Sequence, residues 1–157
     1  MTDFYVQPGQ EVVFAKTVGE SDVYLFAGLT GDLSPVHVNE EAMSRSQYGR
    51  RIAHGALLVG FMSTASTMLI DRFAGRGGGE TPVSLGYDRI RFLGAVFFGD
   101  TVSVTYRVAE IDVAARRAYS DMEVTTQRGD LVAVGRHILK WVPDRSPASS
   151  ADPVEGP

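Results

Sequence analysis

Asp32 and His37 are the two residues whose types and spacing most directly indicate acid–base chemistry. They lie five residues apart in the segment Gly31-Asp32-Leu33-Ser34-Pro35-Val36-His37, where Pro35 restricts the backbone. A carboxylate can orient a water molecule and accept its proton, and an imidazole, with an ordinary pKa of about 6.5, can hold or deliver one near neutral pH. Both residue types also cap helices and stabilise turns, so the spacing alone leaves a structural role open.

A second candidate site is the segment Arg51-Ile52-Ala53-His54-Gly55, which precedes a long apolar run. If a helix begins here, its first amide groups lack intrahelical partners and its dipole favours negative charge. Gly55 would let a ligand approach the backbone, whose donors could stabilise the oxyanion formed when a thioester carbonyl becomes enolate-like. An ordinary helix start is the alternative, with Gly55 needed for packing and His54 for capping.

Short helices are expected to hold the loop that carries Asp32 and His37. Ser21 is a typical helix N-cap, and the helix that follows it should end near Gly28 or Gly31. Asn39 repeats the same start signal, so the intervening residues form a loop between two helices.

A long helix and several strands make up the rest of the expected fold. Residues 56–73 carry apolar side chains on nearly every face, which predicts a buried helix enclosed on most sides. Residues 11–18 and four later segments have the composition of strands: residues 83–93, 102–110, 117–126 and 131–142. Short connections between sequential strands imply an antiparallel sheet, and we expect a single α+β domain whose curved sheet wraps the long helix.

Composition sets limits on function and location. The chain has 157 residues, with 15 Lys+Arg against 19 Asp+Glu, so no electrostatic attraction favours nucleic acid. Cysteine is absent, which removes disulfides and thiolate chemistry. Residues 56–70 are too short an apolar run to span a bilayer comfortably, so we expect a cytoplasmic protein without a membrane partner. Residues 1–145 should form the domain, and 146–157 a disordered tail rich in Pro, Ser and Ala.

The remaining motifs carry less chemistry. The three histidines do not form a His-Glu-x-x-His pattern, so we expect no metal. His137 lies in an alternating strand and is interpreted as a surface or interface residue. A hydrolytic triad of Ser34, His37 and Asp32 would have to form within one short loop that lacks a nucleophile elbow. The glycines at 77–79 are interpreted as a hinge.

Four motifs follow one another along the chain: Phe26-Ala27-Gly28-Leu29-Thr30-Gly31-Asp32, Ser34-Pro35-Val36-His37, Tyr48-Gly49-Arg50-Arg51-Ile52-Ala53-His54-Gly55 and Arg91-Phe92-Leu93-Gly94-Ala95-Val96-Phe97-Phe98-Gly99-Asp100-Thr101-Val102. In this order they resemble the MaoC-like dehydratase family, which includes the R-specific enoyl-CoA hydratases. The resemblance covers roughly residues 12–142. It implies a hot-dog fold, in which a curved antiparallel sheet wraps a long helix, usually as a homodimer or higher homo-oligomer with acyl-thioester sites near the interface.

The resemblance also implies roles for particular residues. Asp32 and His37 are similar to the family's catalytic dyad, which activates water for syn addition across a trans-2-enoyl thioester; the reverse reaction dehydrates an R-3-hydroxyacyl thioester. Gly55 matches the catalytic position whose amide polarises the thioester carbonyl. The implied partner is an acyl-CoA or acyl-carrier-protein thioester. Coenzyme A is then part of the substrate, and no separate cofactor is expected.

Three further residues are expected to bind substrate: Ser34, His54 and Ser63. Ser63 matches a family position that lines the acyl pocket. Ser34 stands where the family usually has Asn before the proline, and its hydroxyl is shorter than a planar amide and reaches differently. The substitution leaves the proton-handling groups Asp32 and His37 in place.

Two other functions share the implied fold: a non-catalytic acyl-thioester-binding domain and a hot-dog thioesterase. Fold alone does not choose among them. Thioesterases of this fold generally lack the Gly-Asp-x-x-Pro-x-His loop that residues 31–37 form here. The resemblance therefore favours a hydro-lyase, an enoyl-CoA hydratase or 3-hydroxyacyl-CoA dehydratase.

Overall fold

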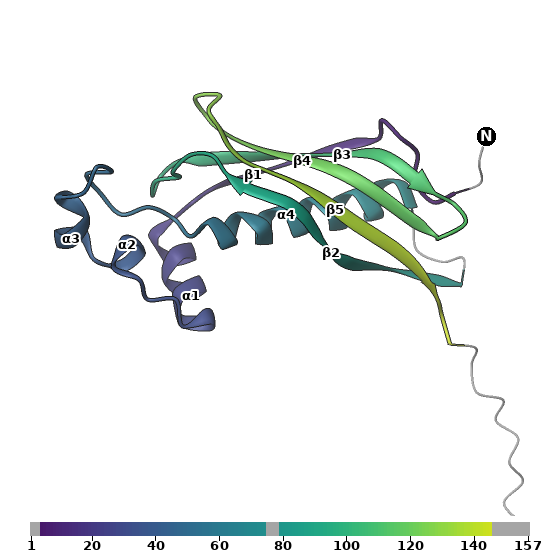
Figure 1. Ribbon diagram of the computed structural model, residues 1–157, viewed down its shortest axis with the longest axis horizontal. Coiled ribbons are helices and arrows are strands. Elements are labelled where there is room, and N and C mark those ends of the chain that lie inside the picture. The colour runs from purple at the N-terminus through teal and green to yellow at the C-terminus, as the bar shows by residue number, and fades with distance from the viewer. Residues whose placement is uncertain (1–3, 75–78, 146–157) are drawn as a thin grey trace, which may run out of the picture.

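A curved five-stranded antiparallel sheet packs against one long helix in the computed structural model, which describes residues 4–74 and 79–145 (Figure 1). The strands are β1 (Glu11–Thr17), β2 (Glu80–Phe92), β3 (Thr101–Asp112), β4 (Arg117–Thr126) and β5 (Leu131–Pro143). Their order across the sheet is β1-β3-β4-β5-β2, and every neighbouring pair is antiparallel. The expected α+β hot-dog architecture is confirmed. The tail at 146–157 and two of the three hinge glycines lie outside the described residues.

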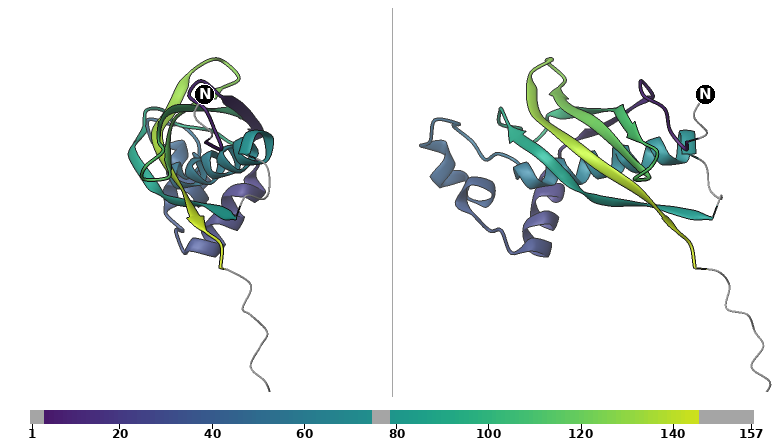
Figure 2. Two further views of the ribbon diagram at one scale, coloured as in Figure 1. Left: turned by 90° about the vertical axis from the view of Figure 1, so that its right-hand side faces the viewer. Right: turned by 45° about the vertical axis from the view of Figure 1, so that its right-hand side comes forward.

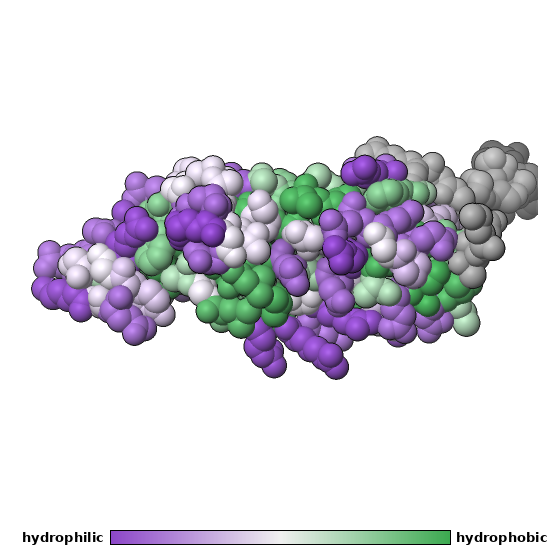
Figure 3. Space-filling view, turned by 90° about the horizontal axis from the view of Figure 1, so that it is seen from above, coloured by the Kyte–Doolittle hydropathy of each residue, from purple (hydrophilic) through white to green (hydrophobic). Residues whose placement is uncertain are grey.

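The long helix runs along one side of the sheet, and the three short helices gather at one end of it (Figure 1). The helices are α1 (Glu20–Thr30), α2 (Pro35–Val38), α3 (Glu40–Ser44) and α4 (Gly55–Leu69), which continues into a π-helical turn, η1 (Ile70–Ala74). Viewed end-on in Figure 2, the sheet curls around α4. Helices α1 to α3 lie at the end of the sheet where α4 begins (Figure 1). In Figure 3 the end of the molecule that carries α3 is hydrophilic.

The local start and stop signals of the short helices are partly as predicted. The N-cap of α1 is Gly19, because the Asp22 carboxylate reaches back and accepts a hydrogen bond from the Gly19 amide at 2.8 Å. The expectation that Ser21 is the cap is therefore wrong. Helix α1 ends at Gly31 with a φ of 79°, and the Asn39 side chain caps α3 at 2.9 Å, both as expected.

Helix α4 is buried on one face only. Its buried residues are Leu58, Phe61, Met62, Ala65, Ser66 and Leu69, and the helix packs against β1 and β3. The opposite face is exposed: Ala56, Gly60, Ser63, Thr64, Thr67 and Met68. Enclosure on most sides was thus wrong for the single chain, because the sheet covers only one side. Residues 55–74 have the length and apolar composition of a membrane-spanning helix, a test that the core helix of a soluble protein also passes.

His137 is fully buried in the core, so its interpretation as a surface or interface residue was wrong. Its ring lies in hydrogen-bond contact with the Tyr106 hydroxyl at 2.7 Å and the Ser84 hydroxyl at 2.8 Å. The Tyr87 ring stacks on it at 4.4 Å. Hydroxyl partners satisfy both ring nitrogens in the neutral state, and burial lowers the pKa of His137 to about 4.

Candidate active site

The segment between α1 and α3 brings Asp32 and His37 to the N-terminus of α4. The expectation that this whole segment is a loop was wrong, because residues 35–38 form the short helix α2, with Pro35 as its first residue. Asp32 directly follows Gly31, the C-cap of α1, and His37 lies in α2. Asp32, His37 and His54 each offer one carboxylate oxygen or ring nitrogen, and these atoms all lie within 4.8 Å of one another. The candidate acid–base pair is therefore spatially close, and His54, at the N-cap of α4, joins it.

The proton position on His37 follows from its hydrogen bond. Its Nδ1 lies 2.8 Å from the carbonyl oxygen of Ile52. Because a carbonyl oxygen only accepts, Nδ1 carries the hydrogen and donates. In the neutral ring the other nitrogen, Nε2, then has a free lone pair. This tautomer leaves His37 able to accept a proton in the cavity that it lines.

His54 is buried and connects the loop to the start of α4. Its Nε2 lies 2.9 Å from the backbone carbonyl oxygen of Asp32, to which it donates, and 3.9 Å from the Asp32 carboxylate. The His54 ring stacks on His37 at 3.7 Å and contacts the Phe26 ring at 4.8 Å. Its Nδ1 is buried without a hydrogen-bond partner among the described residues. His54 thus holds both members of the pair, and its expected contact with substrate stays a prediction.

The Asp32 carboxylate is accessible to water. Its side chain is 52% exposed, and one of its oxygens accepts a long hydrogen bond, 3.4 Å, from the Ser34 amide. An accessible, weakly bonded carboxylate retains the capacity to accept a hydrogen bond from water.

A cavity of about 360 Å³ lies beside this group. Its walls are His37, Tyr48, Ile52, Ala53, Gly55, Leu58, Phe92, Leu93, Gly94, Ala95 and Val96. Gly55 is the first residue of α4, where amide groups lack intrahelical acceptors. A Cβ atom at Gly55 would lie 2.8 Å from the ring of Phe92. Packing therefore requires glycine at a position that also lines the cavity.

Ser34 and Ser63 lie outside these walls. Ser34 is the N-cap of α2, and its side chain makes no capping hydrogen bond. Ser63 is on the exposed face of α4. Their roles in substrate binding stay predictions. Sequence reasoning missed the Ile52 carbonyl and Phe92, because a backbone acceptor and a ring from a distant strand leave no local pattern.

Asp32, His37 and His54 also have the residue types that can surround a cation. Two of the four ring nitrogens already donate to the carbonyls of Ile52 and Asp32, which leaves one nitrogen on each ring and the carboxylate. The expectation that the protein uses no metal stays a prediction.

These features define a single hot-dog domain with a candidate acid–base site at the N-terminus of its central helix. The chain belongs to the MaoC-like domain family, whose model matches residues 3–129. The resemblance found in the sequence is confirmed.

The proteins that resemble this chain in sequence or structure include hydratases and a dehydratase. An (R)-specific enoyl-CoA hydratase of Rhodospirillum rubrum is 37% identical over 130 residues, which cover 83% of this chain and 84% of that protein. A 3-hydroxybutyryl-CoA dehydratase of Methylorubrum extorquens is 33% identical over 149 residues, covering 95% and 87%. The solved structure of an (R)-hydratase from A. caviae involved in PHA biosynthesis superposes with a TM-score of 0.74 at 27% identity, covering 86% of this chain and 96% of that one.

Proposed function

We propose that this protein is a hydratase/dehydratase that adds water to a trans-2-enoyl-CoA to give an R-3-hydroxyacyl-CoA and catalyses the reverse reaction. The observation that carries the proposal is the proximity of the Asp32 carboxylate to the His37 imidazole, which lines one cavity together with Gly55 at the N-terminus of α4. The names of the relatives, an enoyl-CoA hydratase and a 3-hydroxybutyryl-CoA dehydratase, describe hydration and dehydration of acyl-CoA thioesters.

Asp32 and His37 act on the same water molecule in this proposal. The carboxylate and the unprotonated Nε2 each accept a hydrogen bond from it, since a carboxylate oxygen of Asp32 and a ring nitrogen of His37 lie within 4.8 Å of each other. The water oxygen forms the bond to C3 as one of its protons passes to one of the two bases, and the conjugate acid formed in this way delivers a proton to C2, which restores the base. One H and one OH are thus added on the same face of the double bond.

The start of α4 stabilises the charge that develops on the substrate. As the oxygen bonds to C3, negative charge moves onto the thioester carbonyl oxygen until C2 is protonated. An amide of the first turn, at Gly55, donates to that oxygen, and the helix dipole has the favourable sign. Since the amides are held by the helix before substrate arrives, little reorganisation is needed in the transition state.

We also propose that the protein is a homodimer in the cytoplasm, with coenzyme A entering as part of the substrate and no further cofactor. The exposed face of α4 and the edge strand β2, which pairs only with β5 among the described strands, support a second copy. Light scattering after size-exclusion chromatography tests this, and a monomer mass at assay concentration would contradict it.

The function is tested by hydration assays with crotonyl-CoA and a longer trans-2-enoyl-CoA, following enoyl absorbance and free thiol together. We expect the wild type to consume the enoyl group without releasing thiol. Asp32→Asn and His37→Ala should each lower the rate by about a hundredfold or more, since each removes a proton-transfer group. An unchanged hydration rate in Asp32→Asn would contradict the mechanism. Release of free thiol by the wild type would indicate a thioesterase.

A further inference from the structure

The connection between β2 and β3, residues 93–100, is both a wall of the cavity and a support for the candidate catalytic groups. An isolated antiparallel bridge pairs Phe97 with Ile52, and the Ala53 amide donates to the Val96 carbonyl at 2.8 Å. The Ile52 carbonyl in turn accepts the hydrogen bond from His37. Residues 93–100 therefore hold the short segment that orients His37 and leads into α4.

Stacked side chains reinforce this bridge. The Arg50 guanidinium lies 4.1 Å from the centre of the Phe97 ring, and the Arg51 guanidinium lies 4.8 Å from that of Phe98. Such contacts between a cation and an aromatic face are attractive. Segments 50–53 and 96–98 are thus joined by backbone and side chains.

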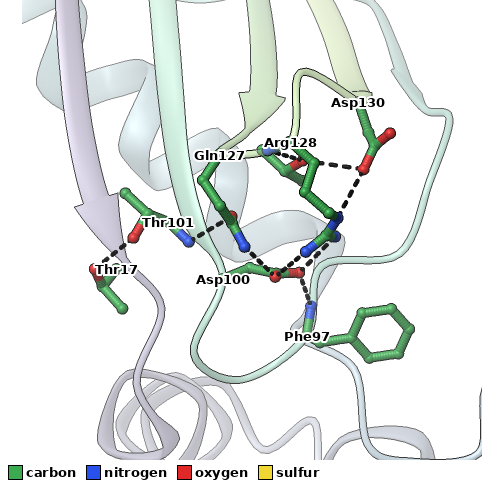
Figure 4. Close-up of polar contacts among 8 residues, drawn as sticks. Thr17, Phe97, Asp100, Thr101, Gln127, Arg128 and Asp130 are labelled. Carbon is green, nitrogen blue, oxygen red and sulfur yellow. Dashed lines mark hydrogen bonds and ion pairs between the residues drawn. The ribbon is translucent and has the colours of Figure 1, made fainter.

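Asp100 holds the far end of this connection. Its carboxylate is buried and accepts hydrogen bonds from the Phe97 amide at 3.0 Å, the Gln127 amide group at 2.8 Å and the Arg128 guanidinium at 2.8 Å (Figure 4). The donors come from the connection itself and from the turn between β4 and β5. One carboxylate therefore ties Phe97, and with it the bridge to Ile52, to a second part of the sheet.

The Asp100 carboxylate is ionised across the range in which enzymes work. Burial favours the neutral acid, but the hydrogen bonds from Arg128, Gln127 and the Phe97 amide outweigh it and lower the pKa of Asp100 to about 2. The backbone carbonyl of Asp100 also accepts a hydrogen bond, at 2.8 Å, from the amide of Val18, the residue that follows β1. An ionised, multiply bonded group is a rigid anchor.

We propose that Asp100 is a positioning residue for the catalytic site: through Phe97 and the bridge to Ile52 and Ala53, it sets the placement of the His37 ring and the Gly55 amide. The kinetic part of this inference rests on the proposed hydratase function. The structural part, the effect of Asp100 on the His37 hydrogen bond, does not.

Asp100→Asn is the direct test, because it keeps the shape but turns an NH₂ group toward the Gln127 and Arg128 donors. We expect kcat for enoyl-CoA hydration to fall about tenfold or more while KM stays within about twofold, since misplaced groups lose transition-state stabilisation. Nuclear magnetic resonance of the ¹⁵N-labelled imidazoles should show His37 and His54 signals displaced. His137, bonded to Tyr106 and Ser84 in the core, serves as an internal control.

A matched control is Arg107→Ala, which removes an exposed arginine bonded to Glu11 across β1 and β3 and leaves the 93–100 connection intact. It should retain the wild-type kcat and imidazole signals. Arg128→Ala provides a second reading if Asp100→Asn does not fold, because Arg128 is half exposed, and it should displace the His37 signals and lower kcat to a smaller extent.

A folded Asp100 variant with wild-type His37 signals overturns the proposal, whatever its melting temperature. If Asp100→Asn does not fold, wild-type His37 signals in Arg128→Ala do the same. A wild-type protein without hydratase activity, combined with displaced His37 signals in Asp100→Asn, would refute the proposed function while leaving the positioning role standing.

Discussion

Single backbone atoms decide what each histidine of the site can do. The Ile52 carbonyl places the hydrogen of His37 on Nδ1, whereas the Asp32 carbonyl places that of His54 on Nε2. His37 keeps a free lone pair beside the cavity, and the free nitrogen of His54 is buried. Two residues of one type are thereby given different roles, a proton acceptor and a support.

Gly55→Ala tests how tightly the start of α4 is packed. The added Cβ would lie 2.8 Å from the Phe92 ring, so the ring or the helix start must move. We expect the hydration rate to fall on the order of tenfold, because the displaced amide no longer points at the oxyanion. Rates measured for the wild type, Gly55→Ala, Phe92→Ala and the double variant form a double-mutant cycle, which measures the coupling between the two residues.

The double variant should recover part of the rate, since the colliding ring is gone. Gly28→Ala in α1 is the control, because nothing lies within 4 Å of its added Cβ. It should keep the wild-type rate and gain about 0.5–1 kcal/mol of stability from reduced chain entropy. Additive effects at Gly55 and Phe92 would show that the ring does not constrain the amide.

At the scale of elements, the conformation at the end of α1 determines where the chain places Asp32. Gly31 has a φ of 79°, a left-handed conformation that residues with a Cβ rarely adopt. Gly31→Ala should cost about 1–2 kcal/mol of unfolding free energy and also lower the hydration rate, because relief of the strain moves Asp32. Denaturant unfolding and initial rates measure the two effects.

Gly9→Ala is the matched control for that element. Gly9 has a φ of 88°, and, as at Gly31, nothing lies within 4 Å of an added Cβ. Gly9→Ala should lose about as much stability as Gly31→Ala, but its hydration rate per folded molecule should be unchanged. Equal rate losses in the two variants would mean that strain acts on the whole fold rather than on Asp32.

At the scale of the whole molecule, buried His137 makes stability depend on pH. Its folded pKa of about 4 is below the ordinary 6.5, so the unfolded chain binds the proton more readily. The contribution of neutral His137 to the unfolding free energy is fully present above pH 6.5. It is lost as the pH drops toward 4, by on the order of 3 kcal/mol. Asp100, with a pKa lowered from 3.8 to about 2, adds a further loss below pH 3.8.

Urea unfolding followed by the fluorescence of Trp141, the chain's one tryptophan, measures this dependence. His137→Gln should unfold at a midpoint that changes much less between pH 6.5 and 4. If His137→Gln kept the full slope, another group would have to be responsible.

Much of the fold and site could be predicted because it is encoded locally. The composition of five segments predicted all five strands, and Gly31 and Asn39 predicted the ends of the segment that holds Asp32 and His37, although not the short helix α2 within it. The order of the motifs indicated the family. Ser21 was wrongly predicted to be the N-cap of α1, because the Asp22 side chain accepts a hydrogen bond from the Gly19 amide and the helix begins after Gly19.

The sequence by itself determined the strands, the longer helices, their order and the residue types of the acid–base pair, because strand composition, helix caps and turns depend on neighbours within a few positions. Only the tertiary structure decided that α4 is covered on one side, that His137 faces inward, that Phe92 lies on Gly55, and that Asp100 supports the segment behind His37. These contacts join residues far apart in the chain, and their existence depends on sheet order and curvature, which no local pattern specifies.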